Sequence, residues 1–157
     1  MTRTQDEIID RYHAADDFFG FAVEVLAEAM TAETIRGINP KAELPDDWAP
    51  KTTQAFEAEA RGYLTFAVGK IVDHRGISAS RSVVKLTEYA WLLGRDDVVE
   101  AMAAADFAQY GAPQVKAFAD GMGWPYLAGD AEDRAALERM ARGDACTPDG
   151  CENGCGQ

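Results

Sequence analysis

Residues 52–72 have the sequence TTQAFEAEARGYLTFAVGKIV and predict one long helix. Its apolar side chains recur at steps of four and three residues, at Phe56, Ala60, Tyr63, Ala67 and Ile71. This spacing places them on one face of an α-helix, so we expect that face to be buried. Gly62 and Gly69 lie seven residues apart, on a face where another backbone could approach closely.

Helices are also predicted downstream of this stretch. Ser78 and Ser80 are both good N-caps for a helix that ends at Gly94. Its apolar positions are Val83, Leu86, Ala90 and Leu93. We expect shorter helices from Asp96 to about Asp106, from Gly111-Ala112-Pro113 onward, and between Asp130 and Gly143.

Upstream, Thr4-Gln5-Asp6-Glu7 matches a capping box and predicts the start of a helix. Apolar residues at alternating steps of four and three extend this helix to about residue 31. Residues 37–50 then contain one glycine and three prolines, which predict a long connection. We expect Trp48 in this connection to cover the end of the core.

These patterns predict an all-α fold, because no stretch alternates cleanly with β-branched residues. The expected architecture is a compact bundle of about five to six helices, with the first two long and antiparallel. The chain of 157 residues is short enough for one domain, which we place at residues 1–143. Residues 144–157 are expected to form a flexible tail rich in cysteine and glycine.

One basic segment stands out, residues 73–82 with the sequence DHRGISASRS. The whole chain has a net charge of −12, yet residues 70–95 carry +3, leaving −15 on the remainder. Helix N-termini attract anions, so a phosphate or carboxylate could bind where this loop enters the next helix. The candidate ligand- or partner-binding residues are His74, Arg75, Ser78, Ser80, Arg81 and Lys85.

A purely structural interpretation of the same segment stays open. Arginines near a loop often pair with neighbouring acids, and serines before a helix are ordinary caps. The segment also lacks the glycine and lysine spacing of a P-loop. If Arg75 and Arg81 are both held by acids such as Asp73 or Glu88, the binding interpretation loses its support.

The segment also carries a resemblance. HRGISASRS at residues 74–82, WLLG at 91–94 and YGAP at 110–113 are similar to patterns in uncharacterised small helical proteins of phages and mobile elements. The likeness covers residues 15 to 127 and omits the cysteine tail. It implies an accessory protein borne by a phage or plasmid in the bacterial cytoplasm, and it assigns no catalytic residue.

Metal binding and catalysis find little support in the sequence. Cys146, Cys151 and Cys155 could supply three thiolates to zinc, but a structural zinc site requires four ligands. Asp10 and His13 share a helix face that points away from the apolar stripe. We therefore expect no metal, no cofactor and no catalytic residue, although enzymatic activity is left undecided.

Composition limits the classes of function. With 27 acidic against 15 basic residues, the chain is not expected to coat nucleic acid, because such binding needs an excess of Lys and Arg. No apolar run is long enough to span a membrane, and the acidic start lacks the pattern of a signal peptide. We expect a cytoplasmic location.

Two functions remain. The first is a small acidic interaction or accessory protein that binds a macromolecular partner, one version being an acidic decoy for DNA-binding proteins. The alternative is a binder or enzyme for a phosphorylated small molecule at loop residues 73–85. The sequence does not fix the oligomeric state.

Overall fold

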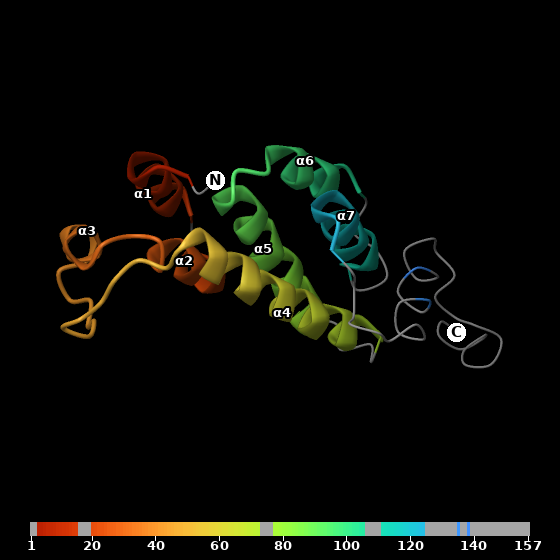
Figure 1. Ribbon diagram of the computed structural model, residues 1–157, viewed down its shortest axis with the longest axis horizontal. Helices are drawn as coiled ribbons and strands as arrows, with labels where there is room; N and C mark the ends of the chain where they lie inside the picture. The colour runs from red at the N-terminus through yellow and green to blue at the C-terminus, as the bar shows by residue number, and fades with distance from the viewer. Residues whose placement is uncertain are drawn as a thin grey trace.

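The computed structural model describes residues 3–15, 20–72, 77–105 and 111–124, together with Ala135 and Glu138. These residues form seven α-helices and no strand, which confirms the all-α bundle (Figure 1). The helices are α1 (Gln5–Ala14), α2 (Gly20–Ala27), α3 (Ala32–Ile38), α4 (Thr53–Val72), α5 (Ile77–Leu92), α6 (Asp96–Ala104) and α7 (Ala112–Met122).

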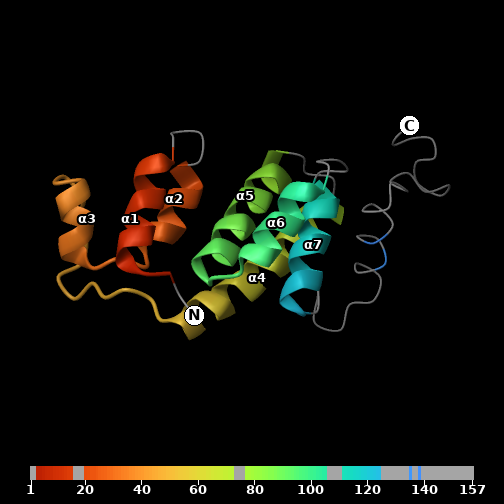
Figure 2. The same cartoon turned by 90° about the horizontal axis from the view of Figure 1, so that it is seen from above.

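Helices α4 and α5 form the long antiparallel pair at the centre of the molecule. α5 contacts α2, α4, α6 and α7, so it has a neighbour on most of its sides. α6 and α7 pack against each other and against α5 at one end, whereas α1, α2 and α3 gather at the other end (Figure 2). The expected long antiparallel pair is therefore present, but it is α4 and α5, not the first two helices.

The core follows the apolar stripe predicted for residues 52–72. Phe56, Ala60, Ala67 and Ile71 are fully buried, and Tyr63 is half-buried at the edge. Other large side chains that are almost fully buried come from the remaining elements: Ile8, Leu26, Met30, Leu86, Tyr89, Leu92 and Phe118. One cluster of buried side chains joins them among the described residues.

The prediction of one helix over residues 4–31 is wrong. The capping box at Thr4 is present, since the Thr4 hydroxyl accepts from the Glu7 N–H and the Glu7 carboxylate accepts from the Thr4 N–H. α1 ends at Ala14 because Ala15 has an extended backbone, with φ −74° and ψ 141°. α1 and α2 are consequently separate helices that contact each other, and residues 16–19 lie outside the described residues.

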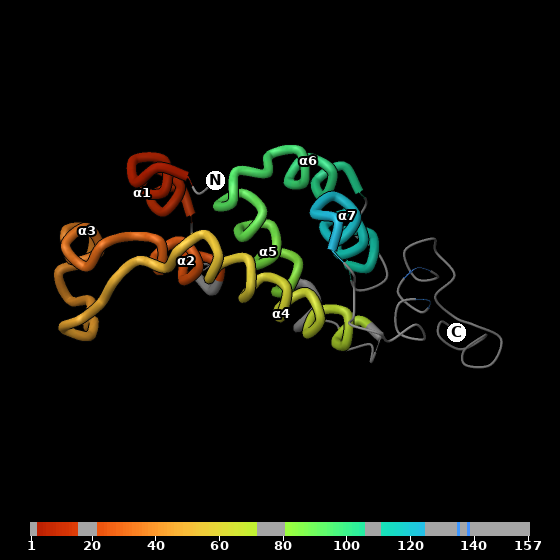
Figure 3. Tube along the Cα trace, viewed as in Figure 1, coloured from red at the N-terminus to blue at the C-terminus, as the bar shows by residue number. Residues whose placement is uncertain are grey.

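The connection before α4 is long, as predicted, and begins with the short helix α3 that the pattern did not identify. Thr31 caps α3 by accepting from the Thr34 N–H at 3.2 Å. The chain then extends away from the bundle and returns to α4 (Figure 3). Trp48 is half-buried against the core and donates from its indole Nε1 to the Met30 carbonyl at 2.9 Å, which confirms its expected role.

The predicted helix ends differ in detail. Gly94 has φ 76° and follows α5 as expected, and Pro113 lies in the first turn of α7. Ser78 and Ser80 lie inside the first turn of α5 and do not precede it. Asp96 is the first residue of α6, whose N-cap is Arg95. The predicted helix between residues 130 and 143 and the cysteine tail lie outside the described residues, apart from Ala135 and Glu138.

Two phenylalanines ten residues apart on α4 test this core. Phe56 is fully buried, so replacing it with alanine should lower the free energy of unfolding by about 3–5 kcal/mol. Phe66 is 48% exposed, and Phe66→Ala should cost clearly less, about 1 kcal/mol, because it removes only surface contacts with Tyr63 and Lys70. Urea denaturation followed by circular dichroism measures both, and equal losses would contradict the assignment of the buried face.

Candidate functional site

The structure describes the predicted binding residues only in part. His74 and Arg75 lie outside the described residues, and so do the side chains of Ser78 and Ser80. Arg81 is exposed, and Lys85, one turn further along α5, is half-buried. The anion site proposed for residues 73–85 therefore stays a prediction.

Lys85 takes part in a surface cluster that α4 completes. Its Nζ lies over the Tyr63 ring, 5.0 Å from the centroid, and the Nζ of Lys70 lies over the Phe66 ring at the same distance. A cation over an aromatic face is attracted by the quadrupole of the ring. We call Tyr63, Phe66, Lys70 and Lys85 the aromatic–lysine patch.

The rings of this patch belong to a row that leads from the core to the surface. Tyr63 lies 6.3 Å from the ring of buried Tyr89 and 5.4 Å from the ring of Phe66. Phe66 is the one large apolar side chain that is exposed among the residues that the structure describes. Since the row starts in the core, its outer rings are held in place by packing.

A polar network fixes the buried end of the row. The Tyr89 hydroxyl donates to Glu59, and Lys51 donates to both Glu59 and Glu28, the latter at 2.7 Å. Burial, together with the Glu59 carboxylate, raises the pKa of Tyr89 well above its ordinary value. Through Glu28, Lys51 and Tyr89, this network joins the end of α2 and the end of the loop before α4 to the last turn of α5.

Charge around Glu59 keeps it ionised. Burial alone would raise the pKa of Glu59, but hydrogen bonds from Lys51 and Tyr89 outweigh it and hold the pKa below its ordinary value. The positive charge of Lys85 acts in the same direction. Glu59 is therefore an ionised carboxylate that belongs to the network and lies near the aromatic–lysine patch.

The outer face of α4 next to Phe66 is open. A Cβ atom built on Gly62 or Gly69 would meet no heavy atom within 4 Å. The spacing of these glycines predicted that another backbone would approach them closely, but no other backbone among the described residues lies close to either glycine. Phe66 lies beside this open face and was missed in the sequence, because the apolar stripe does not include it. An aromatic residue off the buried stripe was the available signal.

The structural interpretation of Arg75 and Arg81 stays a prediction, whereas two other arginines, Arg11 and Arg95, pair with acids near the basic segment. Glu88, whose side chain is 6% exposed, accepts two hydrogen bonds from Arg11 of α1, the one from Nε at 3.1 Å. Arg95 pairs with Asp97 at 2.9 Å and donates to the Gly121 carbonyl. Glu88 is thus occupied by an arginine from outside residues 70–95.

Many carboxylates are engaged within the protein. Described pairs include Arg3–Asp96, Arg11–Glu88, Lys51–Glu28, Lys51–Glu59, Arg95–Asp97 and Lys116–Asp120. A DNA-mimicking decoy needs carboxylates that are free at regular spacing. The carboxylates of these pairs are not available for such mimicry, and the decoy interpretation stays a prediction for the remaining acids.

Neither a metal-binding cluster nor a membrane-spanning helix is found among the described residues. No group of three or more His, Cys, Asp or Glu side chains could hold a metal ion there, and Cys146, Cys151 and Cys155 lie outside that part of the chain. None of the helices in the same part is long and apolar enough to cross a membrane.

Comparison with family models, with curated proteins and with solved structures found no match to this chain.

The ionisation of Glu59 makes the free energy of unfolding depend on pH in the acidic range. Because the pKa of Glu59 is lower in the folded protein than in the unfolded chain, its contribution is present above about pH 4.5 and is lost below it. Glu59→Gln should thus cost more stability at pH 7 than at pH 3, as measured by urea denaturation. Glu57→Gln, exposed on the same helix, is the matched control and should show no such difference. A pH-independent cost at Glu59 would contradict this account.

Proposed function

We propose that this protein is a non-enzymatic accessory protein that binds a partner protein through the aromatic–lysine patch. The observation that carries the proposal is Phe66, a 48% exposed phenylalanine whose ring lies 5.4 Å from that of Tyr63 and 5.0 Å from the Nζ of Lys70. Aromatic side chains are enriched where binding energy concentrates at protein interfaces. A ring that the fold holds rigidly at the surface loses little entropy when it binds.

The chemistry of the patch indicates the kind of partner segment. The segment would place an apolar side chain against Phe66 and carboxylates near Lys70 and Lys85. Both ammonium groups already lie over rings, which orients them without neutralising their charge. A partner carboxylate would therefore find two positioned cations beside an apolar contact.

A protein partner is favoured over nucleic acid. Affinity for nucleic acid grows with the number of phosphates that Lys and Arg neutralise. The patch offers two lysines, with Arg81 one turn away, on a chain whose net charge is −12. That background repels a long polyanion but leaves room for a short acidic segment.

The proposal assigns no reaction to the patch. Its described groups are aromatic rings and ammonium ions, and neighbouring Glu59 is held by Lys51 and Tyr89. The resemblance to proteins of phages and mobile elements supports an accessory role, with the partner being a protein of a bacterial host. A phosphorylated ligand at residues 73–85 remains the alternative.

Site-specific photocrosslinking identifies the partner. A photoreactive phenylalanine analogue replaces Phe66 in one sample and exposed Ala103 of α6 in the control, in lysate of the source cells. Mass spectrometry should find a protein that crosslinks at position 66 and not at position 103. Crosslinks of equal yield at both positions would contradict the proposal, and a crosslink to the chain itself would identify a second copy as the partner.

The purified partner then tests the patch residue by residue. Phe66→Ala, Lys70→Gln and Lys85→Gln should each weaken binding by about tenfold or more in calorimetry, because each removes a central contact. Lys41→Gln removes the same charge from the exposed loop before α4 and should leave the affinity unchanged. Unchanged affinity in the patch variants would contradict the proposal.

A further inference from the structure

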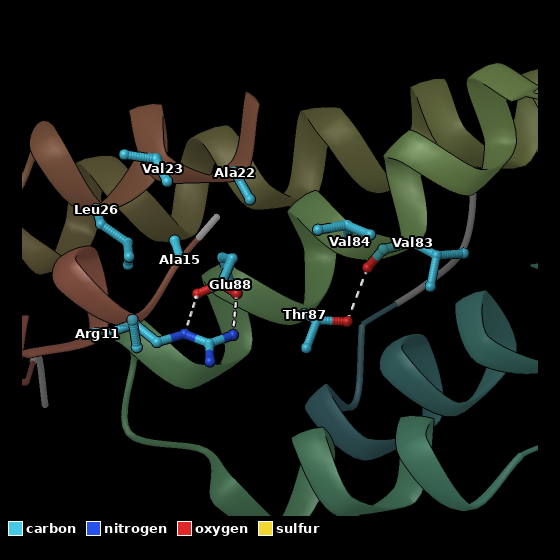
Figure 4. Close-up of a pocket in the computed structure, with 10 residues that line it drawn as sticks. Arg11, Ala15, Ala22, Val23, Leu26, Val83, Val84, Thr87 and Glu88 are labelled. Atoms are coloured by element: carbon cyan, nitrogen blue, oxygen red, sulfur yellow. Dashed lines mark hydrogen bonds and ion pairs between the residues drawn. The ribbon is translucent and has the colours of Figure 1, made fainter. Parts of the chain in front are cut away.

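A pocket of about 240 Å³ lies on another side of α5, where α1, α2 and α5 meet. α1 contributes the end of its last turn, α2 contributes Ala22, Val23 and Leu26, and α5 contributes Val83, Val84, Thr87 and Glu88 (Figure 4). Most of these side chains are alanine, valine or leucine. The pocket is therefore lined mainly by aliphatic groups, as small-molecule sites commonly are.

The polar part of the wall carries no net charge. Arg11 and Glu88 both line the pocket and neutralise each other through two parallel hydrogen bonds. Glu88 strengthens the charged form of Arg11, whose pKa is raised by this contact. The guanidinium also lies 5.9 Å from the centroid of the Trp91 ring, which helps to hold it in place.

The same wall offers hydrogen-bond acceptors. A carboxylate has about four lone-pair positions, and Arg11 occupies only some of those on Glu88. The Thr87 hydroxyl donates to the Val83 carbonyl at 2.8 Å, so its oxygen can still accept from a ligand. A ligand that carries one hydrogen-bond donor can therefore be satisfied at this wall.

We propose that this pocket binds a small, uncharged molecule with an aliphatic body and one hydroxyl group. Because Arg11 and Glu88 are already paired, the wall offers no uncompensated charge to an ionic head group. An anion or a cation would therefore leave water without a net counter-charge, which is costly. A hydroxyl can instead donate to Glu88 or Thr87 while the carbon chain covers the valine and alanine side chains.

Size limits the ligand to a short chain. The volume of about 240 Å³ lies below the range of roughly 300–1,000 Å³ that is common for sites of drug-sized ligands. The pocket shares no residue with the aromatic–lysine patch, since Lys85 lies over Tyr63 whereas the pocket uses Val83, Val84, Thr87 and Glu88 of α5. The two sites are therefore tested separately.

The experiment compares three probes of equal chain length, 1-hexanol, hexanoate and hexylammonium, by ligand-observed NMR titration of the full chain. We expect saturable binding of 1-hexanol and affinities about tenfold or more lower for both ions. Equal affinity for all three would overturn the inference from the neutral wall. Failure of 1-hexanol to bind would overturn the site itself.

Two filling variants locate the binding. Ala22→Leu extends a buried side chain of α2 into the space and should reduce hexanol affinity about tenfold or more. Val84→Phe does the same from the half-buried wall of α5, in case the first variant fails to fold. Ala103→Leu on α6 is the matched control, exposed and remote from the lining, and should bind hexanol as the native chain does. Unchanged binding in folded filling variants would place hexanol elsewhere and overturn the proposal.

Discussion

Helix α5 contacts α2, α4, α6 and α7, and the polar side chains that it buries must therefore find partners inside the protein. Tyr89 and Glu88 are neighbours in sequence and are both buried. Tyr89 finds Glu59 of α4, and Glu88 finds Arg11 of α1. Each bond fixes a different helix against α5, so the positions of α1 and α4 both depend on satisfying this one element. Removing either partner would leave a buried polar group without a hydrogen bond, which costs far more than the bond itself contributes.

This requirement also explains how the charges are distributed. Buried Glu88 takes its arginine from α1, and Lys51 is shared by two carboxylates at the junction of α2 and α4. These pairs act as ties between elements that the apolar core alone would leave free to shift. Lys70 and Lys85 are placed differently, because each lies over an aromatic ring. Neither of them takes part in a described ion pair, although the charge of Lys85 also acts on Glu59.

Sequence patterns predicted the parts of the fold that depend on local periodicity. The apolar side chains from Phe56 to Ile71 share one face of α4, and that face is buried. Gly94 follows the end of α5 with a φ of 76°, a left-handed conformation that stops the helix. The break after Ala14 was not predictable in this way, since the apolar spacing continues through it. The contact of Arg11 with Glu88 joins residues 77 positions apart, and no local pattern encodes such a pair. The sequence predicted Lys85 as a binding residue because of its charge. The cluster that it forms with Tyr63 and Phe66 depends on the packing of α4 on α5, which the sequence pattern does not show.

The pocket and the aromatic–lysine patch both use residues of α5. Successive residues of an α-helix point about 100° apart, so Val84 and Lys85 face different neighbours although they are adjacent. Val84 lines the pocket towards α2, and Lys85 lies over Tyr63 of α4. An enclosed helix with polar side chains on several faces can therefore support an aliphatic pocket and a cationic surface within one turn. The net charge of −12 predicts neither the pocket nor the aromatic–lysine patch. It sums acids that are already in ion pairs together with Lys70 and Lys85, which belong to none of those pairs.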